Sequence, residues 1–180
     1  MKTWIALLRG INVGGRNRLR MKDLSQIFET AGCVQVKTYI QSGNVVFNGH
    51  ARSVGQLGDT IGSAIECEFG FRPVIHLITA KALRTAIASN PYPQAASEPK
   101  SLHLFFLEGS PQKTHISNAN RLLSSSESFT VIGSRLYLYA PDGIARSRLA
   151  KGIDKAFHMN TTARNWRTIT KLSELASTIG

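Results

Sequence analysis

The order of strand-like and helix-like apolar patterns constrains this chain more than any other feature. Continuous or alternating apolar runs are typical of strands, whereas apolar residues at intervals of three and four are typical of helices. Strands are expected at residues 3–8, 34–40, 44–47 and 73–78, and helices at residues 21–31 and 54–69. This order, βαββαβ, is the split unit of a ferredoxin-like fold, in which helices cover an antiparallel sheet.

The second half of the chain partly restarts this pattern. A short helix over residues 80–89 leads into an Asn-Pro-Tyr-Pro segment, which is a candidate internal boundary. The expected elements after it are a strand at 102–107, a helix at 112–123, a hairpin of strands at 129–132 and 135–139, and helices at 145–157 and 162–176. We therefore expect an α+β fold with a ferredoxin-like half, residues 1–90, and a related strand-helix-hairpin-helix half, residues 91–180, together forming one compact domain.

The size and composition of the chain agree with a self-sufficient core. At 180 residues and 42% hydrophobic, the chain can bury about two-thirds of its unfolded surface without a metal or a disulfide. The two cysteines, Cys33 and Cys67, lie in segments expected to be structured, which favours a reducing compartment, the cytoplasm. Arg9 interrupts the N-terminal apolar run before a signal sequence could be completed, and no apolar stretch is long enough to span a membrane.

The formal charge of +11, from 22 Lys and Arg against 11 Asp and Glu, points to an anionic partner. Such a charge attracts nucleotides, nucleic acids and other anions, but it does not specify a fold.

The loop after the first strand concentrates this positive charge among glycines. Residues 9–20 read RGINVGGRNRLR, with four arginines and a helix expected immediately afterwards. Glycines permit positive φ and close backbone approach, and guanidinium groups bind phosphate or carboxylate oxygens through paired hydrogen bonds. The segment is not a nucleotide-hydrolysing P-loop, because Arg16 and Asn17 stand where Lys and Ser or Thr are needed. The alternative is a solvated surface loop without a ligand.

Two other segments offer polar groups. The turn Gln41-Ser42-Gly43-Asn44 presents amides and a hydroxyl, although ordinary turn chemistry also explains these residues. The two C-terminal helices each present a basic face, which is either a binding surface or a solvated exterior. Those faces comprise Arg148, Lys151 and Lys155 on the first helix and Arg164, Arg167 and Lys171 on the second.

No catalytic or metal-binding constellation is evident. The five histidines are scattered without zinc-ligand spacing, and no pair of carboxylates is marked as a general acid and base. An RNA-recognition module is disfavoured because its central strand needs exposed aromatics, whereas residues 44–47 read NVVF. We therefore expect no metal and no cofactor, and the sequence leaves open whether the protein is an enzyme.

Three stretches make the chain resemble a bacterial family catalogued as domain of unknown function 1697: residues 8–15 (LRGINVGG) with residues 21–24 (MKDL), residues 38–47 (TYIQSGNVVF) and residues 162–172 (TARNWRTITKL). A fourth, residues 141–149, departs from the family's pattern because Ala145 stands where a glycine is expected. The resemblance implies a two-part α+β fold with ferredoxin-like character and no known activity.

The leading hypothesis is that the three stretches converge on an anionic small molecule carrying phosphate or carboxylate. Its candidate ligand-binding residues are Arg9, Asn12, Gly14, Gly15, Arg16, Arg18, Gln41, Ser42, Asn44, Arg164, Asn165 and Arg167. The alternatives are nucleic-acid binding through the basic C-terminal helices and a protein-interaction role.

Overall fold

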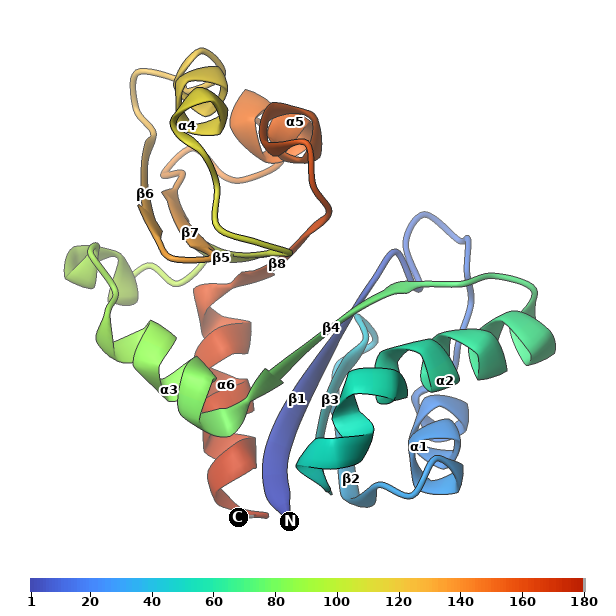
Figure 1. Ribbon diagram of the computed structural model, residues 1–180. Coiled ribbons are helices and arrows are strands. Elements are labelled where there is room, and N and C mark those ends of the chain that lie inside the picture. The colour runs from blue at the N-terminus through green and yellow to red at the C-terminus, as the bar shows by residue number, and fades with distance from the viewer. Residues whose placement is uncertain (180) are drawn as a thin grey trace. The chain divides into compact units, whose positions relative to one another are not determined.

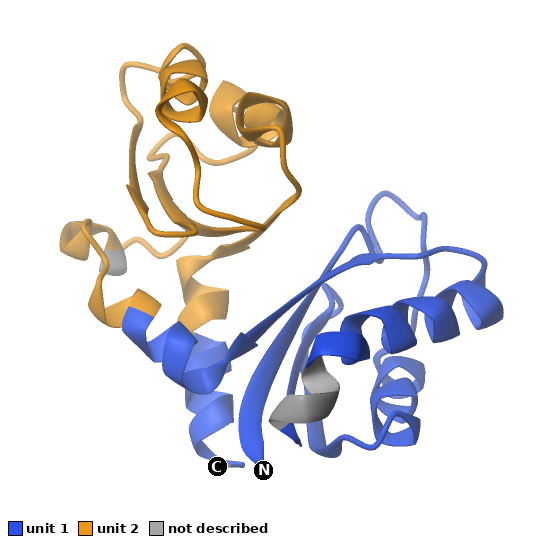
Figure 2. Cartoon of the chain, viewed as in Figure 1, with its two compact units in different colours: residues 1–85, 171–180 blue, residues 86–170 orange. Residues whose placement is uncertain are grey.

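The computed structural model of the chain describes residues 1–179, with the side chains of residues 51–54, including Val54 of the expected second helix, and of residue 96 outside that description. The chain forms two compact units. Unit 1 comprises Met1–Thr85 and Lys171–Gly180, and unit 2 comprises Ala86–Thr170 (Figure 2). The sequence pattern suggested a division between residues 90 and 91; the division observed lies near residue 85, and the last ten residues return to unit 1.

Unit 1 has the βαββαβ order expected from its apolar pattern (Figure 1). Its sheet has the strand order β2-β3-β1-β4, with antiparallel pairing throughout. This is the ferredoxin-like arrangement, in which the first and third strands lie at the centre. The elements are β1 (Lys2–Arg9), α1 (Met21–Thr30), β2 (Val34–Tyr39), β3 (Asn44–Gly49), α2 (Ala51–Phe69) and β4 (Val74–Thr79), followed by α3 (Ala80–Ala88).

The core of unit 1 forms because α1 and α2 each bury one apolar face against the sheet. Phe28 of α1 packs on Phe47 of β3 with ring centroids 5.2 Å apart in a tilted arrangement, a favoured geometry for aromatic pairs. Ile61 and Ile65 of α2 are fully buried in the same cluster. The C-terminal residues are tied to this unit by hydrogen bonds, since Asn48 Nδ2 donates to the carbonyl oxygen of Ile179 at 2.6 Å.

Unit 2 repeats the topology of unit 1. Its sheet has the order β6-β7-β5-β8, again antiparallel, so its four strands occupy the same relative positions. The elements are the 3₁₀ turn η1 (Pro93–Ala96), β5 (Leu102–Leu107), α4 (Lys113–Asn120), β6 (Ser128–Ile132), β7 (Arg135–Tyr139), α5 (Arg148–Phe157) and β8 (Thr161–Asn165). The last helix, α6 (Trp166–Ser177), begins in unit 2 and continues from Lys171 in unit 1. The α+β class, the ferredoxin-like character and the relatedness of the two halves are therefore confirmed.

The expected ending of the chain in two consecutive helices is wrong, because β8 lies between them. Residues 161–165 pair with β5, and α6 begins only at Trp166. β8 is the last strand of a second βαββαβ unit, so the strand-helix-hairpin-helix description of this half was incomplete.

The core of unit 2 lies between one sheet face and the helices α4 and α5. Phe105 and Leu138 from the sheet pack with Leu149, Ile153 and Phe157 of α5, all of them buried.

No described helix is both long and apolar enough to cross a bilayer.

Candidate functional site

The loop between β1 and α1, residues 10–20, is the part of unit 1 with the most unusual backbone; we call it the glycine loop. Five of its residues have positive φ: Gly10 (79°), Asn12 (53°), Gly14 (58°), Gly15 (75°) and Asn17 (51°). Glycine adopts this conformation without penalty, and asparagine tolerates it better than other residues with a side chain. The backbone N–H of Arg16 donates to the carbonyl oxygen of Val13 at 3.0 Å, which closes a tight bend around the two central glycines.

The side chain of Asn12 holds the glycine loop in place. Its Nδ2 donates to the carbonyl oxygens of Leu19 at 2.8 Å and Gln41 at 2.9 Å, and its Oδ1 accepts from the backbone N–H of Leu19 at 2.8 Å. These bonds join the two ends of the loop and connect the loop to the turn between β2 and β3. The glycine loop and the Gln41–Asn44 turn therefore lie side by side in unit 1, with the Asn12 amide engaged within the protein.

The Gln41–Asn44 turn is shaped by close packing. Gly43 has φ of 71°, and a Cβ placed on it would lie 2.7 Å from Cβ of Leu8 and 2.9 Å from Cδ1 of Ile11. Asn44 is fully buried, and its Nδ2 donates to the carbonyl oxygen of Tyr39 at 3.1 Å and to Oγ of Ser42 at 2.8 Å. These groups hold the turn itself, so Gln41 is the member whose side chain lies at the surface.

An open cavity of about 380 Å³ lies where the loop meets the turn, lined by Asn12, Gly15, Arg18, Leu19, Arg20 and Gln41. Its charged side chains are Arg18 and Arg20. The Arg20 guanidinium forms a bidentate ion pair with the Asp23 carboxylate, with Nε–Oδ2 and Nη2–Oδ1 distances of 2.7 Å and 3.1 Å. This interaction raises the pKa of the Arg20 guanidinium. Arg18 and its neighbour Arg16 are exposed and form no ion pair within residues 1–179.

Four other predicted residues do not line this cavity. Arg9 ends β1 and is exposed in unit 1, whereas Arg164, Asn165 and Arg167 belong to unit 2. The Arg164 guanidinium is largely buried, which lowers its pKa to about 10, and its Nη1 donates to the carbonyl oxygen of Ala163 at 2.8 Å. Asn165 Oδ1 accepts from the backbone N–H of Thr168 at 2.9 Å, which stabilises the start of α6 as an N-terminal cap.

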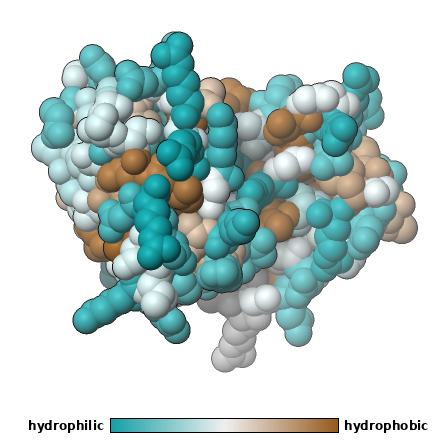
Figure 3. Space-filling model, turned by 90° about the horizontal axis from the view of Figure 1, so that it is seen from above, coloured by the Kyte–Doolittle hydropathy of each residue, from teal (hydrophilic) through white to brown (hydrophobic). Residues whose placement is uncertain are grey.

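Only one of the two basic helical faces exists as expected. On α5, Arg148, Lys151 and Lys155 are exposed, while the opposite side of the helix is buried in the core of unit 2. The second face is not helical throughout, because Arg164 lies in β8 rather than in α6. Hydrophilic side chains also extend over much of the face of the molecule in Figure 3, with apolar patches between them.

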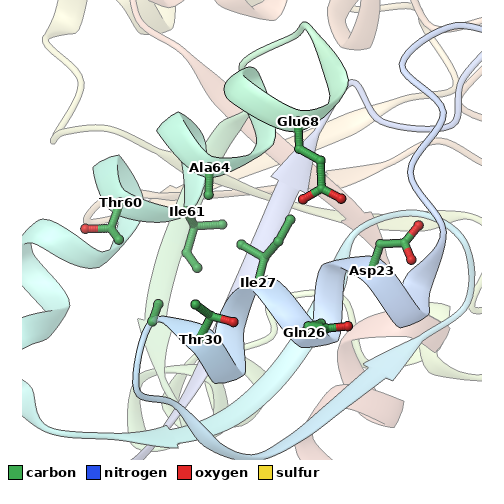
Figure 4. A pocket seen from close by; sticks show the side chains of 9 residues that line it. Asp23, Gln26, Ile27, Thr30, Thr60, Ile61, Ala64 and Glu68 are labelled. Carbon is green, nitrogen blue, oxygen red and sulfur yellow. The ribbon is translucent and has the colours of Figure 1, made fainter.

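A second cavity of unit 1, about 370 Å³, lies between α1 and α2 and has the opposite charge. Figure 4 shows the carboxylates of Asp23 and Glu68 at one end and the hydroxyls of Thr30 and Thr60 at the other. Because its charged lining is acidic, this cavity does not suit an anion.

In the part of the chain that the structure describes, no three His, Cys, Asp or Glu side chains form a group that could hold a metal ion. His115 and His158 lie near each other, with ring centroids 5.9 Å apart, but Nδ1 of His115 accepts the backbone N–H of Gln112 at 3.2 Å. That bond requires the proton on Nε2, so His115 could ligate a metal only by giving up its role in capping α4.

Sequence reasoning missed the pairing that fixes Arg20. The spacing of Arg20 and Asp23, three residues apart at the start of a helix, was the available signal, because an acidic residue in the first turn is a common feature of helix N-termini.

The topology of both units defines the class of protein as a tandem pair of ferredoxin-like α+β units. A family model described as "Protein of unknown function (DUF1697)" matches residues 1–137, and the chain belongs to this family. Among solved structures, the fold resembles that of the conserved bacterial protein SP0830 from Streptococcus pneumoniae. The two share a TM-score of 0.76 and 23% sequence identity over 97% of this chain and 98% of that chain. No curated protein matches the chain.

Proposed function

We propose that unit 1 binds a small anionic molecule, carrying phosphate or carboxylate, at the surface formed by the glycine loop and the Gln41–Asn44 turn. The observation that supports this proposal is the combination of a fixed loop with unpaired cations. Asn12 holds the loop through three hydrogen bonds. Arg18 lines the cavity, and both Arg18 and Arg16 of the same loop are exposed and without an ion pair within the described residues.

A loop held in this way lowers the entropic cost of binding. A flexible loop must be ordered by its ligand, and that ordering reduces affinity. Here the backbone bends are already closed by internal hydrogen bonds, including Asn17 Nδ2 to the carbonyl oxygen of Gly10 at 2.7 Å. Binding therefore has to order the side chains of Arg16 and Arg18 rather than the backbone.

The charge of the lining favours a phosphate-bearing ligand. No carboxylate lines the cavity, and because Arg20 is paired with Asp23, the uncompensated positive charge of the lining comes from Arg18. The backbone N–H groups of Gly14 and Gly15 have no internal acceptor among the described residues, so they are available as further donors. Guanidinium forks together with backbone N–H groups are the donors that phosphate sites use.

The test is a melting-temperature titration with inorganic phosphate and sugar phosphates at constant ionic strength. A ligand present at ten times its dissociation constant stabilises the folded state by about 1.4 kcal/mol, which corresponds to about 3–6 °C for a protein of this size. Arg16→Gln/Arg18→Gln should abolish the shift, whereas Lys81→Gln/Arg84→Gln, which removes two exposed cations of α3 in the same unit, should retain it. Equal shifts in both double variants would show only a general response to charge.

The second candidate function is nucleic-acid binding by α5 of unit 2. The exposed cations Arg148, Lys151 and Lys155 follow one another along a single helix face and have no ion pair within the described residues. Binding of this kind should weaken by about a decade or more as salt is raised through the physiological range, because each phosphate contact releases counterions. Affinity that is independent of salt, or unchanged by Lys151→Gln/Lys155→Gln, would contradict it.

We further infer a cytoplasmic location in a bacterial cell. Both cysteines are free, with Cys33 buried and Cys67 exposed, and an exposed thiol is compatible with a reducing compartment. Fractionation of cells that express the full-length protein tests this location.

A further inference from the structure

Unit 2 has its own cavity, whose lining shares no residue with the proposed anion site. The cavity measures about 340 Å³ and is formed by the segment before β5, the loop between β7 and α5, and the first turn of α6. Two of its side chains, Lys100 and Arg167, are cations, and one, Glu98, is a carboxylate.

The two cations are not neutralised inside the protein. Lys100 and Arg167 are both exposed, and neither lies within ion-pair distance of Glu98 or of any other carboxylate in the described part of the chain. Arg167 is also the second residue of the twelve-residue helix α6, whose N-terminus adds partial positive charge. Two cations and one carboxylate leave the lining with one net positive charge.

The walls of this cavity are held by hydrogen bonds that do not involve the cations. The backbone N–H and Oγ of Ser101 donate to the carbonyl oxygen of Glu98 at 2.8 Å and 2.7 Å. The N–H of Ala140 donates to the carbonyl oxygen of Ser101 at 2.7 Å, and the N–H of Gly143 donates to that of Ala140 at 3.0 Å. Gly143 has φ of 89°, so this turn suits glycine.

The walls are also partly apolar, because Pro99 and Pro141 contribute to the lining. A hydrated inorganic ion gains nothing from contact with proline rings, whereas an organic anion buries apolar surface against them. The single net charge favours a monoanion over a dianion, since Glu98 repels the second charge.

We propose that this cavity is a second, separate binding site, which takes a small organic carboxylate. The carboxylate group pairs with Arg167 and Lys100, and the body of the ligand lies against Pro99 and Pro141. The site differs from that of unit 1 in ligand class, because the unit 1 cavity has no acidic lining and suits phosphate. It stands independently of the function proposed for unit 1, since the two cavities share no residue.

The experiment is a titration of the isotope-labelled full-length protein with benzoate and, in parallel, with inorganic phosphate, followed by amide resonances. Benzoate should shift the Ser101 and Gly143 amides in a saturable way, whereas phosphate should shift Gly14 and Gly15. Arg167→Gln should weaken benzoate binding about tenfold, the usual effect of losing one charge-assisted pair, and Lys100→Gln should weaken it less. Arg146→Gln removes an exposed arginine of the same unit that does not line the cavity, and it should have no effect.

Glu98→Gln provides a test that loss of folding cannot mimic, because removing the one carboxylate of the lining should strengthen benzoate binding. The proposal is overturned if benzoate leaves Ser101 and Gly143 unshifted, if Arg146→Gln weakens binding as much as Arg167→Gln, or if Glu98→Gln weakens it. The phosphate response at Gly14 and Gly15 is recorded in the same spectra, so failure of one site is distinguished from failure of the other.

Discussion

Replacing Asn12 with glycine should separate the structural role of the glycine loop from its charge. The substitution keeps a residue that accepts the φ of 53° but removes three side-chain hydrogen bonds, two of them partly buried and one exposed. A partly buried bond contributes about 1 kcal/mol net and an exposed one less. We therefore expect Asn12→Gly to lower the free energy of unfolding of unit 1 by about 2 kcal/mol.

The matched control is Asn17→Gly, because Asn17 has nearly the same φ, 51°, but donates a single exposed side-chain hydrogen bond to Gly10. Backbone effects of the added glycine are then nearly equal, and the variants should differ by about 1.5 kcal/mol. Urea unfolding followed through unit 1 amide resonances measures this difference. Hydrogen exchange adds a local readout, since the Leu19 amide should lose protection only in Asn12→Gly. If the two variants unfold at the same urea concentration, Asn12 does not hold the loop as described.

Three further predictions concern packing and titration. Gly43→Ala should destabilise unit 1 by about 3 kcal/mol or more, because the new Cβ would lie 2.7 Å from a neighbouring side chain. The Cβ of Gly14→Ala meets open space, so this variant should lose only about 1 kcal/mol. Similar urea midpoints for the two variants would contradict this. Burial lowers the pKa of His103 to about 4, so as the pH falls the unfolded chain takes up this proton before the folded protein does. The free energy of unfolding should therefore fall between about pH 6.5 and pH 4, by at most about 3 kcal/mol. His103→Leu should remove that part of the pH dependence, and an unchanged pH profile would refute the assignment. A disulfide reagent should modify exposed Cys67 quickly and Cys33 only on unfolding, since burial raises the pKa of the Cys33 thiol to about 11; simultaneous labelling of both thiols in the folded protein would contradict this.

The fold could be predicted from the sequence wherever each element has its own apolar period. The strands expected at residues 3–8 and 44–47 were both found, because β1 and β3 are central strands that bury apolar residues on both faces, over residues 5–8 and 45–47. The strand β8 was missed for two reasons. Its five residues are too few to show a clear alternating pattern, and Arg164 stands at helical spacing from the basic residues of α6, so the helix was predicted to begin too early. The β-branched pair Thr161-Thr162 and the capping side chain of Asn165 were the signals for a strand that ends before Trp166.

The candidate site could be predicted only in part, for a related reason. Residue type shows that an amide or a hydroxyl is present but not whether the protein already uses it. Asn12, Ser42 and Asn44 have the donors of a binding site, yet the structure uses their side chains to hold the loop and the turn. The exposed guanidinium groups of Arg16 and Arg18 have no such internal partner within the described residues, so the proposed chemistry rests on them.

Locating bound phosphate on the protein tests the proposed anion site of unit 1 most directly. In a titration of the labelled protein at constant ionic strength, we expect saturable shifts of the Gly14, Gly15 and Arg16 amides. These shifts should disappear in Arg16→Gln/Arg18→Gln and persist in Lys81→Gln/Arg84→Gln. Shifts that grow without saturation, or that are scattered over the basic surfaces of both units, would show that the glycine loop has no anion site.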